Sequence, residues 1–457
     1  MTGSHLDLTT RRLASYVVNA EFAILPAQAV HEARRRIVDS IACAAGAYLE
    51  PFCARTREFA SMYSGTPQAR IWGSGQRTSI EMAAFANGTM LRYLDHNDTH
   101  FGRSAGHPSD MIGALVATAE AYERSGEALV AAIVSAYEIY CSLCNAVALK
   151  SRAIDQATAA AVGTSAGVGR LLGLNEDAMG HALSLALAPN LHLYNVRRGT
   201  LSQWKGCAGP NGARNGAFAA LLAARGFTGP SGVIEGKGGL MELMGQFDWQ
   251  AGRGQLPLIT GTHLKLHPVC YHGQSAIDAT LALRPGVSPG EVEQIEVETY
   301  DASFQMMGAE PHCWAPATRE TADHSLPFTV AVALEDGRLN SDSYAPERLV
   351  NAGTRALMNK IRVTNSDELT RGFPQQCATR VTVHMRDGRT LVHLQEYPKG
   401  NAGNVLSEAE LEAKFTMLYQ PWGDQGAARC ALDALWSVER AQDIAALLDV
   451  ACSAASA

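Results

Sequence analysis

Val292-Glu-Gln-Ile-Glu-Val-Glu-Thr-Tyr300 alternates apolar residues with charged or polar ones, which is the period of a half-buried β-strand. Arg380-Val-Thr-Val-His-Met385 shows the same alternation. It is followed by Asp387-Gly388 and then by Thr390-Leu-Val-His-Leu394, a pattern typical of a β-hairpin. These stretches predict a small β-sheet in the second half of the chain.

Helical patterns lie between these strands and on both sides of them. Residues 326–334 and 343–360 carry apolar side chains at helical spacing, so the unit that contains the strands is α+β. Outside it, the main segments with the same period are 30–44, 111–121, 128–147, 157–174 and 211–225, with more helix after residue 406. We therefore predict a mainly α protein in which an α+β lid domain, residues 269–403, is inserted into a large all-helical domain formed by residues 1–268 and 404–457.

The composition excludes several classes of protein. The chain has 457 residues, 47% of them hydrophobic and 18% charged, which is typical of a globular protein of about two domains. Its net charge of -7 argues against nucleic acid as the main partner, because that role needs a basic face. No apolar run is long enough to span a bilayer, and Met1–Thr10 lacks the pattern of a signal peptide. We therefore expect a cytoplasmic protein without membrane contact.

The ten cysteines are expected to be free thiols in a reducing compartment. Cys141 and Cys144 have the spacing of a metal or redox pair. No second pair completes a zinc site, and both lie in an apolar helical pattern. We predict that they are core residues.

A loop rich in acids and imidazoles interrupts the helical pattern. Leu94-Asp-His-Asn-Asp-Thr-His100 and Gly106-His-Pro-Ser-Asp110 together hold three histidines and three aspartates. A metal site and a solvated loop with capping aspartates are two readings, and Asp110 is a natural cap for the helix that follows. The spacing matches no metal pattern, and histidine titrates near neutral pH, so general acid–base chemistry is favoured.

Three further segments combine cations with histidines. Lys205 follows Trp204 at the start of an Ala-rich helix, where it can pair with a carboxylate or simply extend over the indole. Lys265-Leu-His-Pro-Val-Cys-Tyr-His272 lies at the predicted domain boundary, where sites are common, although its histidines can also pack locally. In Asp323-His324, the aspartate either orients the imidazole or caps the next helix.

Taken together and in order, these motifs resemble the MmgE/PrpD family. The resemblance rests on these stretches: Arg92–Thr99, His107–Asp110, Ser202–Ala208, Lys265–Gln274, Ala322–Pro327, Tyr397–Gly400 and Lys414–Phe415. The family includes 2-methylcitrate dehydratase, cis-aconitate decarboxylase and iminodisuccinate epimerase. The resemblance implies a helical domain built from both chain ends, a smaller α+β lid, a homodimer, and catalysis without metal or iron–sulfur cluster.

The resemblance also implies which residues act. Asp95, Thr99, His107, Lys205 and Lys265 match family active-site positions. The implied chemistry is removal of a proton α to a carboxylate, with Lys205 and Lys265 binding carboxylates and stabilising the charge that develops. His107 is then the acid or base, and Asp95 orients it or holds the loop.

Three positions depart from the family pattern. Gln156 stands where relatives usually carry a histidine, and Phe328 where they usually carry a tyrosine; neither side chain transfers a proton. Cys270 replaces a histidine of the decarboxylases, which argues against decarboxylation. His272 and His324 are candidate substitutes as proton carriers.

These observations predict a metal-independent lyase that dehydrates a small hydroxy di- or tricarboxylate, as 2-methylcitrate dehydratase does. An epimerase or isomerase of a related dicarboxylate and a catalytically altered binding homologue are the alternatives. We expect no cofactor and no metal. The expected site residues are catalytic His107, Asp95, Lys205 and His272, with substrate bound by Thr99, Lys265, Gln156, His324 and Phe328.

Overall fold

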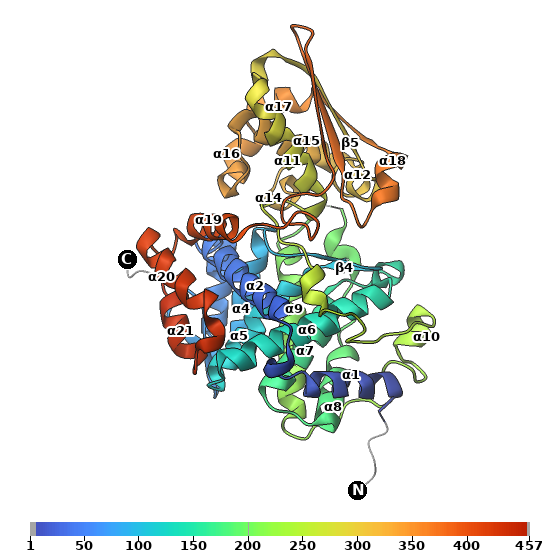
Figure 1. The fold of residues 1–457 in the computed structure, drawn as a ribbon, viewed down its shortest axis with the longest axis vertical. Helices are drawn as coiled ribbons and strands as arrows, with labels where there is room; N and C mark the ends of the chain where they lie inside the picture. Colours follow the sequence, from blue (N-terminus) through green and yellow to red (C-terminus); the bar gives the residue numbers. More distant parts are fainter. Residues whose placement is uncertain (1–5, 200, 455–457) are drawn as a thin grey trace.

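A computed structural model of the chain describes residues 6–199 and 201–454. Figure 1 shows a helical body below and a smaller lobe with a β-sheet above it. The predicted fold class, mainly α with a smaller α+β part, is confirmed. Of the stretch Met1–Thr10, from which the lack of a signal peptide was predicted, residues 1–5 lie outside the described range.

The helical body is formed by segments from both ends of the chain. Its first segment contains α1 (Leu8–Asn19), α2 (Ala27–Gly46), α3 (Pro51–Ser61), α4 (Ile80–Tyr93), α5 (Ile112–Ala121), α6 (Gly126–Ala146), α7 (Ala157–Leu171), α8 (Glu176–Leu187), α9 (Trp204–Ala223) and α10 (Leu240–Met244). Its second segment contains α19 (Glu408–Tyr419), α20 (Gln425–Trp436) and α21 (Ile444–Ala451). In Figure 1 α19 and α20 lie beside α2, and α21 lies beside α5.

Small residues let the central helices approach closely. A Cβ at Gly212 of α9 would lie 2.2 Å from the Ala157 carbonyl oxygen of α7, and one at Gly216 would lie 2.1 Å from the Ala161 oxygen. Such contacts leave no room for a side chain at these glycines. The Ala- and Gly-rich composition of both segments is therefore a requirement of packing.

The α+β lobe is built on a four-stranded sheet with the order β6-β5-β7-β8. Its strands are β5 (Val292–Thr299), β6 (Ile361–Asn365), β7 (Thr379–Met385) and β8 (Thr390–Gln395). β5 pairs with β6 in parallel and with β7 antiparallel, and β7 pairs antiparallel with β8. The lobe's helices are α11 (Gln274–Leu283), α12 (Asp301–Met307), α13 (Pro311–Trp314), α14 (Arg319–Ala322), α15 (Leu326–Asp336), α16 (Pro346–Leu349), α17 (Ala352–Met358) and α18 (Asp367–Gly372).

Each part has its own large hydrophobic core. One core draws on residues from Leu13 to Leu264 and again from Leu406 onward, and the other on residues from Val269 to Met385. This division supports the domain boundaries that we propose, between residues 268 and 269 and between residues 403 and 404.

Several local features differ from the sequence prediction. β6 was not predicted, and the helix expected over 343–360 is two short helices, α16 and α17. The body, expected to be all helical, also holds two short antiparallel pairs: β1 (Gln68–Arg70) with β2 (Arg77–Ser79), and β3 (His100–Phe101) with β4 (Ala105–Gly106). Asp110 does not cap α5 with its side chain; it lies in a turn of 3-10 helix, Pro108–Met111.

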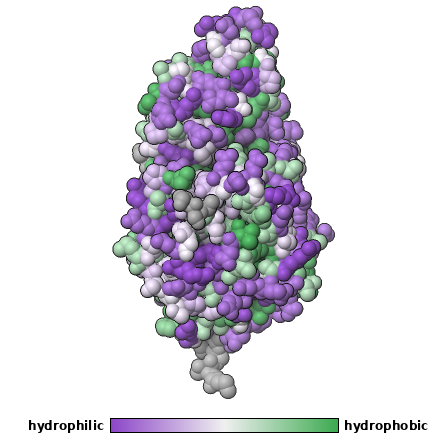
Figure 2. Space-filling view, turned by 90° about the vertical axis from the view of Figure 1, so that its left-hand side faces the viewer, coloured by the Kyte–Doolittle hydropathy of each residue, from purple (hydrophilic) through white to green (hydrophobic). Residues whose placement is uncertain are grey.

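The long apolar helix α6 is buried. α6 is long and apolar enough to cross a membrane, but 89% of its most apolar window is buried in the protein, and α2 with α3 meets the same criterion only as a pair bent by 102°. Cys141 and Cys144 lie in α6 as buried free thiols, as predicted. The face in Figure 2 is mostly hydrophilic, with hydrophobic residues in small groups.

Candidate active site

The acid–histidine loop runs from the end of α4 to the start of α5; residues 94–100 and 108–110 are buried, whereas Arg103 and Ala105 are exposed. Asp95 is buried and has a φ of +52°, in the left-handed region that is uncommon for residues other than glycine. Its carboxylate accepts a hydrogen bond from Arg92 Nη1 at 2.8 Å, and Arg92 lies in the last turn of α4. Backbone strain at a buried, ion-paired aspartate is typical of a functional position.

Two lysines from distant segments meet Asp95. Lys265 Nζ lies 2.5 Å from Asp95 Oδ1, and Lys205 Nζ lies 3.2 Å from Asp95 Oδ2. Lys205 lies in the first turn of α9, which begins at Trp204, about two turns before the start predicted at residue 211. Burial alone would raise the pKa of Asp95, but Arg92, Lys265 and Lys205 hold it well below its usual range. The carboxylate is therefore ionised and serves as the centre of a cluster of cations.

The α+β lobe contributes Asp323 and His324 to the same cluster. Lys205 Nζ donates to Asp323 Oδ1 at 2.8 Å and to Oδ2 at 3.1 Å. His324 Nδ1 lies 2.5 Å from Asp323 Oδ1, and His324 Nε2 lies 3.8 Å from Asp95 Oδ2. The cap of α15 is Ser325, whose hydroxyl accepts from the Phe328 N–H. Of the two roles that the sequence allowed for Asp323, orienting the imidazole or capping the next helix, the structure therefore favours the first.

Asp95, Asp323 and His324 have ligand atoms within 4.8 Å of one another, close enough for a metal ion. Lys205 Nζ lies within 3.2 Å of all three side chains. At this point the ammonium supplies the positive charge that a metal ion would supply, so the donor set is matched to a lysine.

A hydrogen bond to a backbone carbonyl sets the orientation and the tautomer of His107. Its Nδ1 lies 2.7 Å from the Asp98 carbonyl oxygen, which can only accept, so Nδ1 carries the proton. Burial lowers the pKa of His107 well below its usual value, and Arg92 and Lys265 lower it further. His107 is thus a neutral imidazole whose Nε2 has a free lone pair, which is the form a general base requires.

Thr99 and Gln156 support the backbone around His107. The Thr99 hydroxyl donates to the Gly106 carbonyl at 3.0 Å. Gln156 Nε2 donates to Asp110 Oδ2 at 3.1 Å, and its oxygen accepts from the Tyr140 hydroxyl. A Cβ at Gly106 would lie 2.7 Å from Gln156 Cβ, so the amide side chain packs directly behind the loop.

His272 and Phe328 have different surroundings from the residues described above. His272 Nδ1 is 2.7 Å from the Tyr300 hydroxyl, and burial, with the charge of His324, lowers its pKa to about 3. Phe328 has no exposed surface and belongs to the core of the α+β lobe, 6.1 Å from the Tyr344 ring. The structure brings Asp95, Lys205, Lys265 and His324 together but places Phe328 inside the lobe.

Two cations flank an aromatic ring near this cluster. Lys150 Nζ lies 5.3 Å from the centre of the Tyr194 ring, and the Arg198 guanidinium lies 5.6 Å from it. Burial and the charge of His324 have the larger effects on the pKa of His272, and the charge of Lys150 lowers it further. Within residues 6–199 and 201–454, no carboxylate forms an ion pair with Lys150 or Arg198. Both cations are available to an anion.

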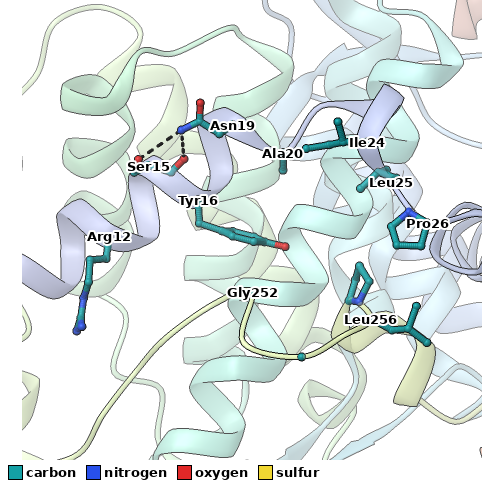
Figure 3. Close-up of a pocket in the computed structure, with 12 residues that line it drawn as sticks. Arg12, Ser15, Tyr16, Asn19, Ala20, Ile24, Leu25, Pro26, Gly252 and Leu256 are labelled. Carbon is teal, nitrogen blue, oxygen red and sulfur yellow. Dashed lines mark hydrogen bonds between the residues drawn. The ribbon is translucent and has the colours of Figure 1, made fainter.

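A separate pocket of about 580 Å³ lies between α1 and residues 252–257 of the helical body (Figure 3). Tyr16 extends into it, and Arg12 is its one charged lining residue. None of the predicted site residues lines this pocket, so the reactive groups converge elsewhere.

Sequence reasoning missed Arg92 and left Asp323 undecided. Arg92 was visible as a cation three residues before Asp95, a spacing at which helical side chains meet. Lys414 of α19 is a buried positioning group: its Nζ donates to Asp39 Oδ1 at 2.6 Å and to the carbonyl oxygens of His96 and Lys265 at 2.8 Å each. No local pattern indicates these tertiary contacts.

Comparisons with known proteins cover nearly the whole chain. The family model described as the MmgE/PrpD N-terminal domain matches residues 11–250, and the MmgE/PrpD C-terminal domain matches residues 267–440. The chain is 28% identical over 424 residues to a 2-methylcitrate dehydratase of Cupriavidus necator and 27% identical over 423 residues to one of Salmonella typhimurium, with 85% of each chain covered. It is 26% identical over 399 residues to a fungal alkylcitrate dehydratase, covering 80% of this chain and 78% of the relative.

Proposed function

The chain belongs to the MmgE/PrpD family, and we propose that it is a hydro-lyase that removes water from a small hydroxy di- or tricarboxylate. The names of its relatives support the reaction class. The observation that carries the proposal is the buried cluster in which Lys205 and Lys265 meet Asp95 beside a neutral His107. Such a cluster suits an anionic substrate that must lose a proton from carbon.

His107 is the proposed base. With Nδ1 bound to the Asp98 carbonyl, Nε2 accepts the proton from the carbon next to a carboxylate. Proton removal leaves negative charge on that carboxylate, and fixed cations are the groups that stabilise such charge. Lys205 and Lys265 are the cations that stabilise this charge, and Asp95 holds both ammonium groups in place.

His324 is the proposed proton donor to the departing hydroxyl. Burial and Lys205 oppose its charge, but Cys270 and Asp323 raise its pKa to about 9, so it is an imidazolium at neutral pH. His272 is neutral there because its pKa is about 3. The sequence named both histidines as candidate proton carriers, and this difference in pKa favours His324 over His272 as the acid.

Phe328, which the sequence suggested as a substrate-binding residue, has no role in the proposal because it lies in the core of the α+β lobe. We propose that Thr99 and Gln156 hold the loop and the substrate around His107, and that the enzyme needs no metal and no cofactor. We also propose a homodimer in the cytoplasm that binds neither nucleic acid nor membrane.

The test is an absorbance assay for the unsaturated acid formed from 2-methylcitrate or citrate. The proposal expects the absorbance to rise with at least one of them, and to rise far more slowly in a His107→Asn variant. No rise with either substrate would overturn the dehydratase assignment. Exchange of substrate hydrogen with solvent deuterium without loss of water would instead identify an epimerase, and thermal stabilisation by tricarboxylates without turnover a binding homologue.

A further inference from the structure

Lys150 and Arg198 are two exposed cations that lie against the same tyrosine ring. Lys150 Nζ is 5.3 Å from the centre of the Tyr194 ring, and the guanidinium carbon of Arg198 is 5.6 Å from it. In the described part of the chain, neither cation has a carboxylate partner. Burial, and after it the charge of Arg198, lowers the pKa of Lys150, as expected for two cations that share no counter-ion.

Backbone hydrogen bonds fix the turn that carries Tyr194. Its N–H donates to the Ala153 carbonyl at 2.8 Å. The Asp155 N–H donates to the His192 carbonyl, also at 2.8 Å. Asp155 directly precedes Gln156, the residue that packs behind the acid–histidine loop. The turn is therefore attached to the segment that leads into the site.

Arg197 connects the same turn to Lys205. Its Nε lies 3.0 Å from Asp155 Oδ2, and its Nη1 donates to the Lys205 carbonyl at 3.0 Å. Asp155 thus neutralises Arg197, whereas Arg198, the next residue, keeps an unpaired charge. Because the turn is bonded to both Asp155 and Lys205, it places the Arg198 side of the ring at the edge of the site.

A pocket of about 580 Å³ lies beside this turn, a volume typical of small-molecule sites. Arg198 and Trp204 line it, together with Ala208, which lies three residues after Lys205 in α9. Of the described residues that line the pocket, Arg198 is the one with a permanent charge. His192 also lines it, but burial lowers the pKa of this imidazole, so it is neutral at pH 7. The pocket therefore offers an anion access to Arg198 from the neighbourhood of Lys205.

We propose that Lys150 and Arg198 form a second anion subsite, which binds a substrate carboxylate remote from the carbon that loses its proton. The inference rests on the proposed dehydration and names its substrate class, a tricarboxylate in preference to a dicarboxylate. Lys205 and Lys265 serve the carboxylate at the reacting carbon and one neighbour. A further pair of cations matches a third carboxylate, which a guanidinium can bind through two parallel hydrogen bonds.

The first measurement is binding of propane-1,2,3-tricarboxylate, which has no hydroxyl group to lose, and of succinate, by titration calorimetry. Lys150→Gln and Arg198→Gln should each raise the Kd of the tricarboxylate about three- to tenfold, and that of succinate less than about twofold. Lys150→Arg keeps the charge and should bind as wild type does.

The matched control is Lys237→Gln, which removes the same charge from an exposed position at another pocket of the helical body. It should leave both Kd values unchanged. The subsite is refuted if wild type does not bind the tricarboxylate, if neither cation variant binds it more weakly, or if the loss is as large for succinate or in Lys237→Gln.

The second measurement separates KM from kcat. A remote carboxylate is bound alike before and during the reaction, so Arg198→Gln should raise KM for a hydroxy tricarboxylate about three- to tenfold and change kcat much less. A fall in kcat at constant KM would contradict the subsite. Tricarboxylate binding that depends on Lys150 and Arg198, in a protein that dehydrates no acid, would contradict only the proposed function.

Discussion

At the scale of single residues, the charges of the site are set by partners from other parts of the chain. Asp95, Lys205, Lys265 and His324 were predicted as site residues from motifs, and the structure brings them together. Which of them is charged could not be predicted, because that depends on tertiary neighbours. His272 and His324 look equivalent in the sequence, yet one has a pKa of about 3 and the other of about 9.

The base role of His107 gives the sharpest prediction at this scale. His107→Asn removes the Nε2 lone pair, so kcat/KM should fall by about 10²–10⁴-fold. The matched control is His100→Asn in the same loop, whose imidazole bonds Asn145 and joins no group of the cluster. Steady-state kinetics check this, and a loss below tenfold in His107→Asn, or an equal loss in both variants, would contradict the assignment.

At the scale of secondary-structure elements, close backbone approach decides which residues the helices tolerate. In α9, Gly209 faces Asp110, and a Cβ there would lie 1.8 Å from Asp110 Oδ2. At Gly206, one turn earlier, the nearest atoms would be 3.7 Å away, in Tyr93. The two glycines look alike in the sequence and differ only in what α9 packs against.

Gly209→Ala should therefore destabilise the protein by about 1–3 kcal/mol, because the methyl group has no space. Gly206→Ala should be neutral or stabilising by up to about 1 kcal/mol, because alanine is the better helix former. Urea denaturation of the two variants and of wild type measures this difference. Equal effects of both substitutions would show that α9 does not pack on Asp110 as described.

A second prediction concerns α19, which returns from the C-terminal segment to hold the site. Lys414→Met would leave Asp39 buried without its cation and the carbonyl oxygens of His96 and Lys265 without this donor. We expect a loss of about 3–5 kcal/mol in the free energy of unfolding. Arg429→Ala breaks pairs of an exposed arginine with Glu412 of α19 and Asp433 of α20, and should cost about 1 kcal/mol or less. A loss for Lys414→Met no larger than for Arg429→Ala would refute the anchoring role.

At the scale of the whole molecule, the division into body and lobe could be predicted from periodicity alone. The alternation in β5, β7 and β8 marks the lobe, and the helical period on both sides marks the body. β6 escaped prediction because it is short and pairs in parallel with β5, far away in the sequence. Contacts between the two ends of the chain, such as that of Lys414 with Asp39, carry no local signal and were not predicted.

The many buried histidines make the stability of the molecule depend on pH. Burial lowers the pKa of His96 and His107 well below the usual value and that of His263 to about 3, the charge of a neighbouring group adding to the effect in each case. The unfolded chain takes up protons at these groups below about pH 6.5, and the folded protein does not. The free energy of unfolding should therefore fall as pH decreases from 6.5, by up to about 1.4 kcal/mol per histidine and pH unit.

His324 acts in the opposite sense, because its pKa is raised: its contribution is complete below about pH 6.5 and is lost as pH rises through about 9. Denaturant midpoints at pH 5.5, 6.5 and 7.5 check the main trend. A midpoint that stays constant or increases toward pH 5.5 would contradict the burial of neutral histidines.

The central claim is that this site removes a proton from carbon and expels water from a hydroxy carboxylate. The most direct measurement is NMR of a panel of hydroxy and unsaturated di- and tricarboxylates, incubated with the enzyme in deuterated water. We predict that one hydroxy acid and its unsaturated partner interconvert, with one deuterium entering the carbon next to a carboxylate during hydration, and that His107→Asn and Lys205→Ala abolish both signals. No interconversion with any member of the panel, or full activity in both variants, would contradict the account.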